Sequence, residues 1–243
     1  MKEYIFEEKN TWNIEYQYYS ESKDLFYTAI TKNASTECIK VLVEDKNIRI
    51  NASLSDVDEV HNLGYLANVK SWRKAYSSKY KMVVFRDPID RIVSAFNDII
   101  VNRHQLGVAS SICHVRGYDL KDFNFNFFID YIVNTPCWHL DPHFKRQCDF
   151  LINVDYNLVI NINNLKSTWE TLFGDTLAPT TKKHYSKQKV DISDAYNIPF
   201  DQLVDLSRRG FNLSSDSYLN ENIKLKIQLY YADDFEILTK YCK

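Results

Sequence analysis

Two patterns of hydrophobic and polar positions alternate along the chain. Short apolar runs are typical of buried strands, and apolar positions at helical spacing are typical of helices that bury one face. Short apolar or β-branched runs predict buried strands at 25–31, 81–87 and 156–162, with a further short strand at 48–52. Helical spacing begins at Cys38 and recurs in five later segments, at 62–78, 88–103, 122–134, 165–174 and 221–241. Alternating strands and helices predict a three-layer α/β fold around a central, mostly parallel sheet.

The chain has 243 residues, a length that suits one large domain. We find no internal repeat, low-complexity tract or Pro/Gly/Ser-rich linker that would divide it. We therefore assign 1–243 to a single domain, with an N-terminal extension over 1–24 and a core over 25–241.

Composition narrows the possible partners. A net charge of −2 gives no basic field for nucleic acid, so any anion site must be local. The 17 tyrosines and 14 phenylalanines favour an aromatic-rich core.

The start of the chain is too polar for a signal peptide and no apolar run is long enough for a membrane segment. Five cysteines without a CxxC pair suit a reducing compartment, so we expect a cytoplasmic protein, although a chain trimmed of a Golgi anchor would look the same.

The loop "TKNAST", residues 31–36, has the layout of a phosphate-binding loop between a strand and a helix. Lys32 follows the strand, and the hydroxyls of Ser35 and Thr36 stand at the helix start, where unpaired N–H groups favour an anion. The glycines of such loops are missing, and Ala34 is the small residue that would let a ligand approach the backbone. An ordinary helix start with a solvated lysine would give the same pattern.

The second candidate anion site is "VVFRDPIDRIVSAF", residues 83–96. Asp87 is a natural N-cap and Pro88 a natural first helical residue. Arg86 at the strand end and Ser94 in the second helical turn could hold a phosphate, although Arg86 could instead pair with a carboxylate. The remaining polar residues of this helix are expected with Ser94 on the face opposite its apolar residues, namely Asp90, Arg91, Asn97 and Asp98.

Together the two motifs resemble the sulfotransferases that use 3′-phosphoadenosine 5′-phosphosulfate (PAPS), especially carbohydrate sulfotransferases of the HNK-1 and chondroitin/dermatan type and their bacterial relatives. "TKNAST" resembles the 5′-phosphosulfate loop, commonly P-K-x-G-x-[ST]-[ST], and "VVFRDPIDRIVSAF" resembles the 3′-phosphate motif, R-[DE]-P-x-x-R-[LI]-x-S-[AY]-[FY]. "LDPHFKRQCDFLINVDYNLVININNL" and "LYYADDFEILTKY" are similar to later family segments, so the resemblance spans residues 25 to 241. Thr31 and Ala34 depart from the usual proline and glycine, Phe144 from a tryptophan and Asn163 from a nearby glutamate.

The resemblance implies a donor, PAPS, that leaves as adenosine 3′,5′-bisphosphate. It implies a P-loop-like 5′-phosphosulfate loop of Lys32, Asn33, Ala34, Ser35 and Thr36, with Lys32 catalytic on the leaving phosphate. Arg86 and Ser94 would bind the 3′-phosphate. The segment "TTKKHYSKQ" resembles a late loop that closes over the nucleotide, which adds three candidates, His184, Ser186 and Lys187.

The acceptor hydroxyl needs a base, and histidine is the usual choice near neutral pH. His61 lies where the carbohydrate enzymes often carry a catalytic histidine, although a surface or capping role is equally compatible with its position. His143 matches the family's H-W position, and we assign it with His139 to the acceptor site. Both histidines are also alternatives to His61 for the base. Asp58 and Glu59 are the alternatives for the base.

The function expected from the sequence is sulfuryl transfer from PAPS to a carbohydrate hydroxyl. A P-loop-like kinase or NTPase would need the Walker string G-x-x-x-x-G-K-[ST], which the chain lacks. A non-catalytic nucleotide- or glycan-binding module of the same fold is a further alternative. The acidic and histidine residues show no ligand spacing, so we expect no metal.

Overall fold

The computed structural model describes residues 14–46, 60, 63–69, 71–103, 106–117, 119–174, 178–179 and 188–242. The chain forms two compact units, and each is described by itself. Unit 1 comprises Met1–Arg86, Arg146–Lys182 and Glu236–Lys243, and unit 2 comprises Asp87–Lys145 and Lys183–Phe235. Because neither unit is continuous in sequence, segments far apart along the chain build each core.

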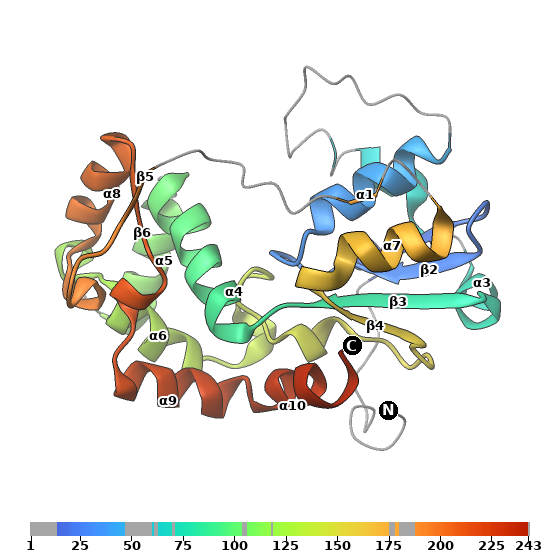
Figure 1. The fold of residues 1–243 in the computed structure, drawn as a ribbon. Coiled ribbons are helices and arrows are strands. Elements are labelled where there is room, and N and C mark those ends of the chain that lie inside the picture. Colours follow the sequence, from blue (N-terminus) through green and yellow to red (C-terminus); the bar gives the residue numbers. More distant parts are fainter. Residues whose placement is uncertain are drawn as a thin grey trace. The chain divides into compact units, whose positions relative to one another are not determined.

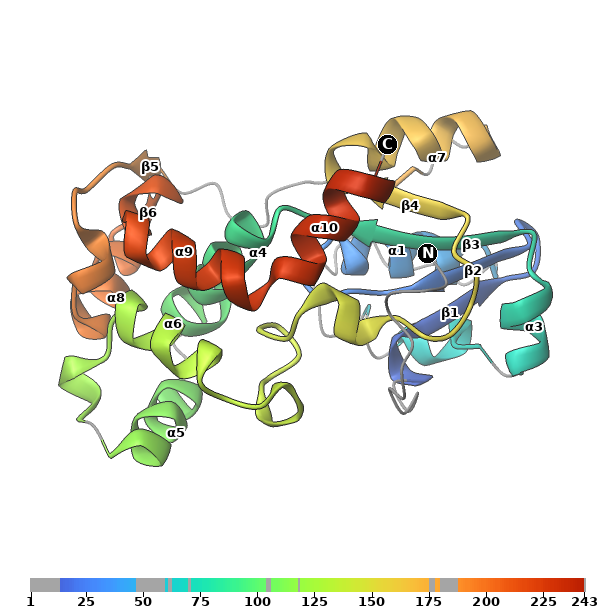
Figure 2. The same ribbon diagram turned by 90° about the horizontal axis from the view of Figure 1, so that it is seen from below.

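Unit 1 contains a four-stranded sheet in the order β1-β2-β3-β4 (Figures 1 and 2). The strands are β1 (Gln17–Ser20), β2 (Leu25–Thr28), β3 (Tyr80–Phe85) and β4 (Leu158–Asn161). β1 pairs antiparallel with β2, whereas β2, β3 and β4 are parallel, so the predicted mostly parallel sheet is confirmed. β1 lies within the segment that the sequence assigned to an N-terminal extension.

Helices cover both faces of this sheet, which makes the three layers (Figure 1). Helices α1 (Ser35–Glu44) and α7 (Leu165–Phe173) lie on one face. The part of α10 (Ala232–Tyr241) in unit 1 lies on the other, with α3 (Trp72–Ser77) at the sheet's end. Strand side chains alternate between the faces. Met82 and Val84 pack with Trp169 of α7, whereas Val83 and Phe85 pack with Ile237 of α10.

Unit 2 is mostly helical. It contains α4 (Pro88–Ala95), which continues as π-helix through Phe96–Asn102, and then α5 (Leu106–Arg116), α6 (Phe125–Val133), α8 (Phe200–Arg208) and α9 (Glu221–Tyr230). A two-stranded parallel sheet joins β5 (Gln188–Val190) to β6 (Phe211–Leu213). Its core centres on Phe96, whose ring lies 5.0 Å from the rings of Phe125 and Phe128. Many of the chain's aromatic residues therefore lie in the core of unit 2.

Two helix predictions were wrong in extent. Among its described residues, the segment 62–78 is helical at 63–64, continues as a 3₁₀ turn (Tyr65–Ala67) and becomes helical again in α3. Asn68 interrupts the helix, because it is extended and bridges to Tyr18. The expected helix 221–241 breaks at Tyr231 into α9 and α10. Tyr231 is buried, and its hydroxyl donates a hydrogen bond to the carbonyl oxygen of Phe144 at 2.6 Å. This contact with a residue distant in sequence coincides with the break in the helix. The expected strand 48–52 lies outside the described residues.

Candidate active site

The loop between β2 and α1 replaces glycine by placing other residues in the left-handed region. Lys32 has φ 68° and Ala34 has φ 58°. A residue with a Cβ in this conformation costs roughly 1–2 kcal/mol, so two of them in one loop need support from their surroundings. Ala34 is the N-cap of α1. Its methyl side chain cannot accept a hydrogen bond, so it does not cap the first-turn N–H groups of α1.

Two buried amides supply that support. Asn33 is fully buried, and its Nδ2 donates to the carbonyl oxygen of Val84 at 2.8 Å and to Oε1 of Gln147 at 2.5 Å. Gln147 is also fully buried; its Oε1 accepts from the backbone N–H of Arg86 at 2.9 Å, and its Nε2 donates to the Arg86 carbonyl oxygen at 2.9 Å. The two side chains therefore join the loop to the end of β3, where such buried hydrogen bonds rigidify the backbone.

The same two segments also meet through Arg86. Its Nη1 donates a hydrogen bond to the carbonyl oxygen of Lys32 at 3.3 Å. Both side chains are half-buried, so both retain access to solvent. Lys32 and Arg86, which the sequence assigned to two separate anion motifs, are thus neighbours at the carboxyl ends of adjacent parallel strands.

A cavity of about 220 Å³ lies beside the loop in unit 1. Thr31 and Ser35 contribute hydroxyl-bearing side chains to its lining, next to aromatic residues of the β1 segment, Tyr16 and Tyr18. Ser35 is nearly buried, whereas Thr36 is half-buried. Thr31 and Ser35 of the predicted loop therefore line the cavity, whereas Thr36 lies at the partly exposed start of α1.

The start of α4 in unit 2 confirms the predicted cap. Asp87 Oδ1 accepts from the backbone N–H groups of Ile89 at 2.9 Å and Asp90 at 3.1 Å, and Pro88 is the first helical residue. Ser94 is half-buried and lies two residues before the π-helix. Two residues of the expected polar face lie in the interior, since Arg91 is only 1% exposed and Asn97 is buried.

Arg91 is buried because its guanidinium binds backbone carbonyls. Nη1 donates to the carbonyl oxygen of Lys145 at 2.6 Å, and Nη2 to that of Pro142 at 3.4 Å. These two carbonyls flank His143. Within the turn, Asp141 Oδ1 accepts from the His143 backbone N–H at 2.8 Å and lies 2.7 Å from His143 Nδ1.

These contacts change the pKa of the Asp141 carboxyl group. Partial burial raises the pKa of Asp141, but the hydrogen bonds from His143 and the charges of His143 and Lys145 outweigh burial and lower it below its ordinary value. Asp141 is therefore ionised near neutral pH. A fixed negative charge beside an imidazole is an arrangement that acid–base chemistry uses.

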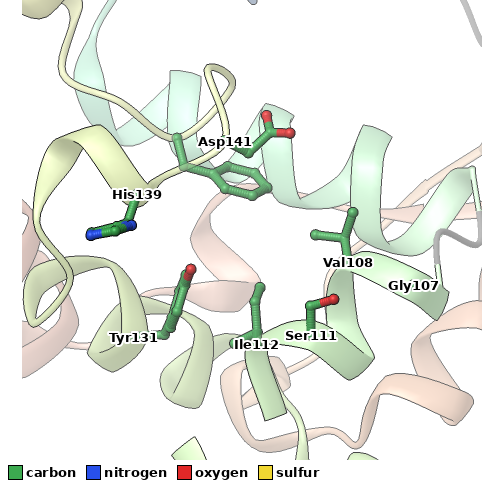
Figure 3. Close-up of a pocket in the computed structure, with 8 residues that line it drawn as sticks. Gly107, Val108, Ser111, Ile112, Tyr131, His139 and Asp141 are labelled. Atoms are coloured by element: carbon green, nitrogen blue, oxygen red, sulfur yellow. The ribbon is translucent and has the colours of Figure 1, made fainter. Parts of the chain in front are cut away.

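Next to this turn, unit 2 has a second cavity of about 230 Å³ (Figure 3). Ser111 and Ile112 of α5 and Tyr131 of α6 lie on one side of it, and His139 and Asp141 lie on the other. His139 is exposed, and its ring lies 6.1 Å from that of Trp138, which is 72% exposed. Exposed aromatic rings beside polar side chains are suited to the faces and hydroxyls of sugars.

A family model described as "Sulfotransferase family" matches residues 17–241. The chain belongs to the sulfotransferase family. No curated protein and no solved structure matches it. The match begins at β1 and ends with α10, so the sulfotransferase region takes in both units.

Several predicted site residues of this sulfotransferase lie outside the described residues, namely His61, Asp58, Glu59, His184, Ser186 and Lys187. Conversely, Gln147 and Asp141 were missed as contributors, although both lie in the segment that resembles the family. Their roles depend on partners elsewhere in the fold, and no local pattern marks a buried glutamine.

The described part of this sulfotransferase contains no group of three or more His, Cys, Asp or Glu side chains placed to hold a metal ion. Within the same ranges, every helix is too short or too polar to cross a membrane.

Proposed function

We propose that this sulfotransferase transfers a sulfuryl group from PAPS to a hydroxyl of a carbohydrate. The observation that carries the proposal is the contact between Arg86 and Lys32, which unites the two anion motifs at the carboxyl ends of β2 and β3. Ligands of open α/β sheets collect at this edge. A nucleotide with phosphates on both sides of its ribose needs two neighbouring anion sites, as PAPS does.

The loop after β2 would hold the 5′-phosphosulfate. The first-turn N–H groups of α1 and the hydroxyls of Ser35 and Thr36 supply donors, and Lys32 supplies a positive charge. Asn33 would act through the shape of the loop, because its side-chain amide is buried and bonded to β3 and Gln147. Ala34 would turn the chain into the helix by its left-handed conformation.

Arg86 and Ser94 would bind the 3′-phosphate, with His184, Ser186 and Lys187 as further contacts on that side. A guanidinium fork and a hydroxyl are suited to this group, because each can donate to a different phosphate oxygen. These assignments rest on the family motif and, for Arg86, on its position beside Lys32.

In the reaction, the acceptor oxygen attacks sulfur in line with the leaving phosphate, as in phosphoryl transfer. A new O–S bond forms while the S–O bond to the 5′-phosphate breaks, and negative charge grows on that phosphate. The ammonium group of Lys32 would stabilise this charge, which is larger in the transition state than in the bound donor.

The acceptor is proposed to be a carbohydrate, contacted by His139 and His143. The cavity of unit 2 supports this class, because it presents the Tyr131 hydroxyl and His139 beside the exposed Trp138. The acceptor hydroxyl must lose a proton, and His61 is the base that the sequence favours.

The proposal is tested by melting curves of the protein with adenosine 3′,5′-bisphosphate, with AMP, and with ATP plus Mg²⁺. The bisphosphate should raise Tm without metal, and AMP should do so much less. A stronger Mg²⁺-dependent shift with ATP would favour a kinase or NTPase instead. Labelled PAPS incubated with unsulfated chondroitin and heparosan then tests transfer to sugars.

A further inference from the structure

The cavity of unit 1 shares two of its walls with the proposed phosphosulfate loop. Thr31 is the first residue of that loop and Ser35 the first residue of α1, and both line this space of about 220 Å³. The other described lining residues come from the segment that leads into β1, from β1 itself, from the end of β2 and from α1, namely Glu15, Tyr16, Tyr18, Ala29 and Ile39. All of them belong to unit 1, so the cavity is built within one unit.

The charge of this cavity is opposite to that of the residues proposed to bind the phosphates. Glu15 is the one charged side chain among the described residues that line it, and neither Lys32 nor Arg86 is part of that lining. A carboxylate repels phosphate, sulfate and uronate groups, whereas it accepts hydrogen bonds from hydroxyl groups. The cavity is therefore suited to an uncharged ligand that is rich in hydroxyls.

Two tyrosines give the cavity aromatic walls that the surrounding structure holds in place. The ring of Tyr16 packs edge-on against that of Phe150 at 5.1 Å, and its carbonyl oxygen accepts from the Ala29 N–H at 2.8 Å. Tyr18 is only 5% exposed, and its backbone forms a β-bridge with Asn68. Rigid aromatic side chains with polar ends are suited to sugars, which present C–H groups and hydroxyls together.

The Tyr18 hydroxyl remains protonated near neutral pH. Burial raises the pKa of Tyr18 to about 12, and the nearby Tyr16 and Glu15 act in the same direction. A protonated phenol can donate a hydrogen bond, and a carboxylate can only accept one. Tyr18 and Glu15 therefore supply the cavity with groups of both kinds, as a sugar ring with several hydroxyls requires.

The geometry of the reaction connects this cavity to the acceptor. The acceptor oxygen must approach sulfur in line with the leaving phosphate, so an acceptor subsite has to adjoin the loop that holds the phosphosulfate. Thr31 and Ser35 belong to both the loop and the cavity wall. We propose that the cavity of unit 1 binds an uncharged sugar residue of the acceptor, the residue whose hydroxyl receives the sulfuryl group. This inference rests on the proposed function, and it assigns to Glu15 the selection against uronates.

The position of the transferred label tests this selection. Chondroitin and heparosan alternate an uncharged N-acetylhexosamine with a uronate, so the labelled residue is the one that entered the subsite. After incubation with labelled PAPS, each polymer is digested to disaccharides and the sulfated residue is identified by mass spectrometry. Wild type should place the label on the N-acetylhexosamine. Label on the uronate would overturn the proposal.

Three variants test the lining directly. Glu15→Gln and Tyr18→Phe should each raise KM for the acceptor roughly 10-fold, the scale of one such hydrogen bond, with kcat and affinity for adenosine 3′,5′-bisphosphate unchanged. Glu15→Lys should also move part of the label to the uronate, because it reverses the charge of the cavity. Glu21→Gln removes an exposed carboxylate from the turn between β1 and β2 and is the matched control, which should change neither KM nor the label position.

The inference and the proposed function fail in different ways. A normal acceptor KM in folded Glu15→Gln, or an effect on KM confined to His139→Ala in the cavity of unit 2, would overturn the subsite and leave the function intact. If neither polymer is an acceptor, uncharged oligosaccharides and oligogalacturonate replace them, and transfer to oligogalacturonate alone would also overturn the subsite. A wild-type protein that binds the bisphosphate and sulfates none of these carbohydrates would overturn the proposed function, and the subsite with it.

Discussion

The guanidinium of Arg86 donates a hydrogen bond to the backbone carbonyl oxygen of Lys32, across 3.3 Å. An arginine that would bind one end of the donor thereby contacts the residue that would act at its other end. Loss of the side chain should remove a charged contact to the nucleotide and one support of the loop.

Arg86→Ala should therefore weaken binding of adenosine 3′,5′-bisphosphate by about 1.5–3 kcal/mol, the scale of a hydrogen bond to a charged group. Binding of AMP, which lacks the 3′-phosphate, should change much less. Calorimetric titration of both nucleotides measures the difference, and Arg86→Lys should give an intermediate loss because it keeps the charge without the fork. Equal losses for the two nucleotides would contradict a 3′-phosphate contact.

Lys32→Ala should affect turnover more than binding. The ammonium group meets charge that is partly present in bound PAPS and grows in the transition state, so kcat should fall strongly while affinity for the bisphosphate weakens modestly. Single-turnover rates together with titration separate the two effects. Lys40→Ala, on the following helix α1, is the control for loss of a lysine. A change in affinity alone would show that Lys32 only binds the donor.

Ala34→Gly should stabilise the protein or leave its stability unchanged. Glycine relieves the strain of φ 58° at this position, at the cost of greater freedom in the unfolded chain, for a net gain of up to about 1 kcal/mol. The same change at Ala109, inside α5, should cost about 1 kcal/mol or more. Denaturant unfolding of both variants measures the contrast. A similar loss at both sites would mean that Ala34 carries no strain.

Gln147→Met tests the buried amide link. Methionine nearly preserves the volume but leaves the Asn33 amide and both backbone groups of Arg86 without this partner. The free energy of unfolding should fall by about 1–3 kcal/mol, the cost of leaving a buried polar group unsatisfied. Affinity for adenosine 3′,5′-bisphosphate should fall as well. Gln202→Met, at an exposed position of α8, should change neither quantity appreciably.

The parts of the structure that were predictable depend on local chemistry. Asp87 and Pro88 mark the start of α4 because a cap bonds to the N–H groups that follow it. Gly174 ends α7 in the left-handed conformation for the same local reason. The parallel strands were predictable because strands buried on both faces appear in the sequence as short, continuous apolar runs.

The parts that were missed depend on distant partners. Gln147 meets Arg86 across 61 positions of sequence, and Arg91 meets Lys145 across 54. Helical periodicity placed Arg91 on the polar face of α4, yet it lies in the interior, where two carbonyl oxygens accept hydrogen bonds from its guanidinium. The break at Tyr231 likewise depends on the carbonyl of Phe144, which sequence periodicity does not report.

The fully buried amide of Asn33 has a consequence for how a nucleotide would be received. A glycine-rich loop is mobile when empty and loses conformational entropy as it closes around a phosphate. Here buried side chains already hold the backbone in its left-handed turns, so the cost of the strained conformation is paid when the protein folds. Nucleotide binding to such a preorganised loop should follow lock-and-key behaviour, with a small entropic penalty and an association rate that rises linearly with nucleotide concentration.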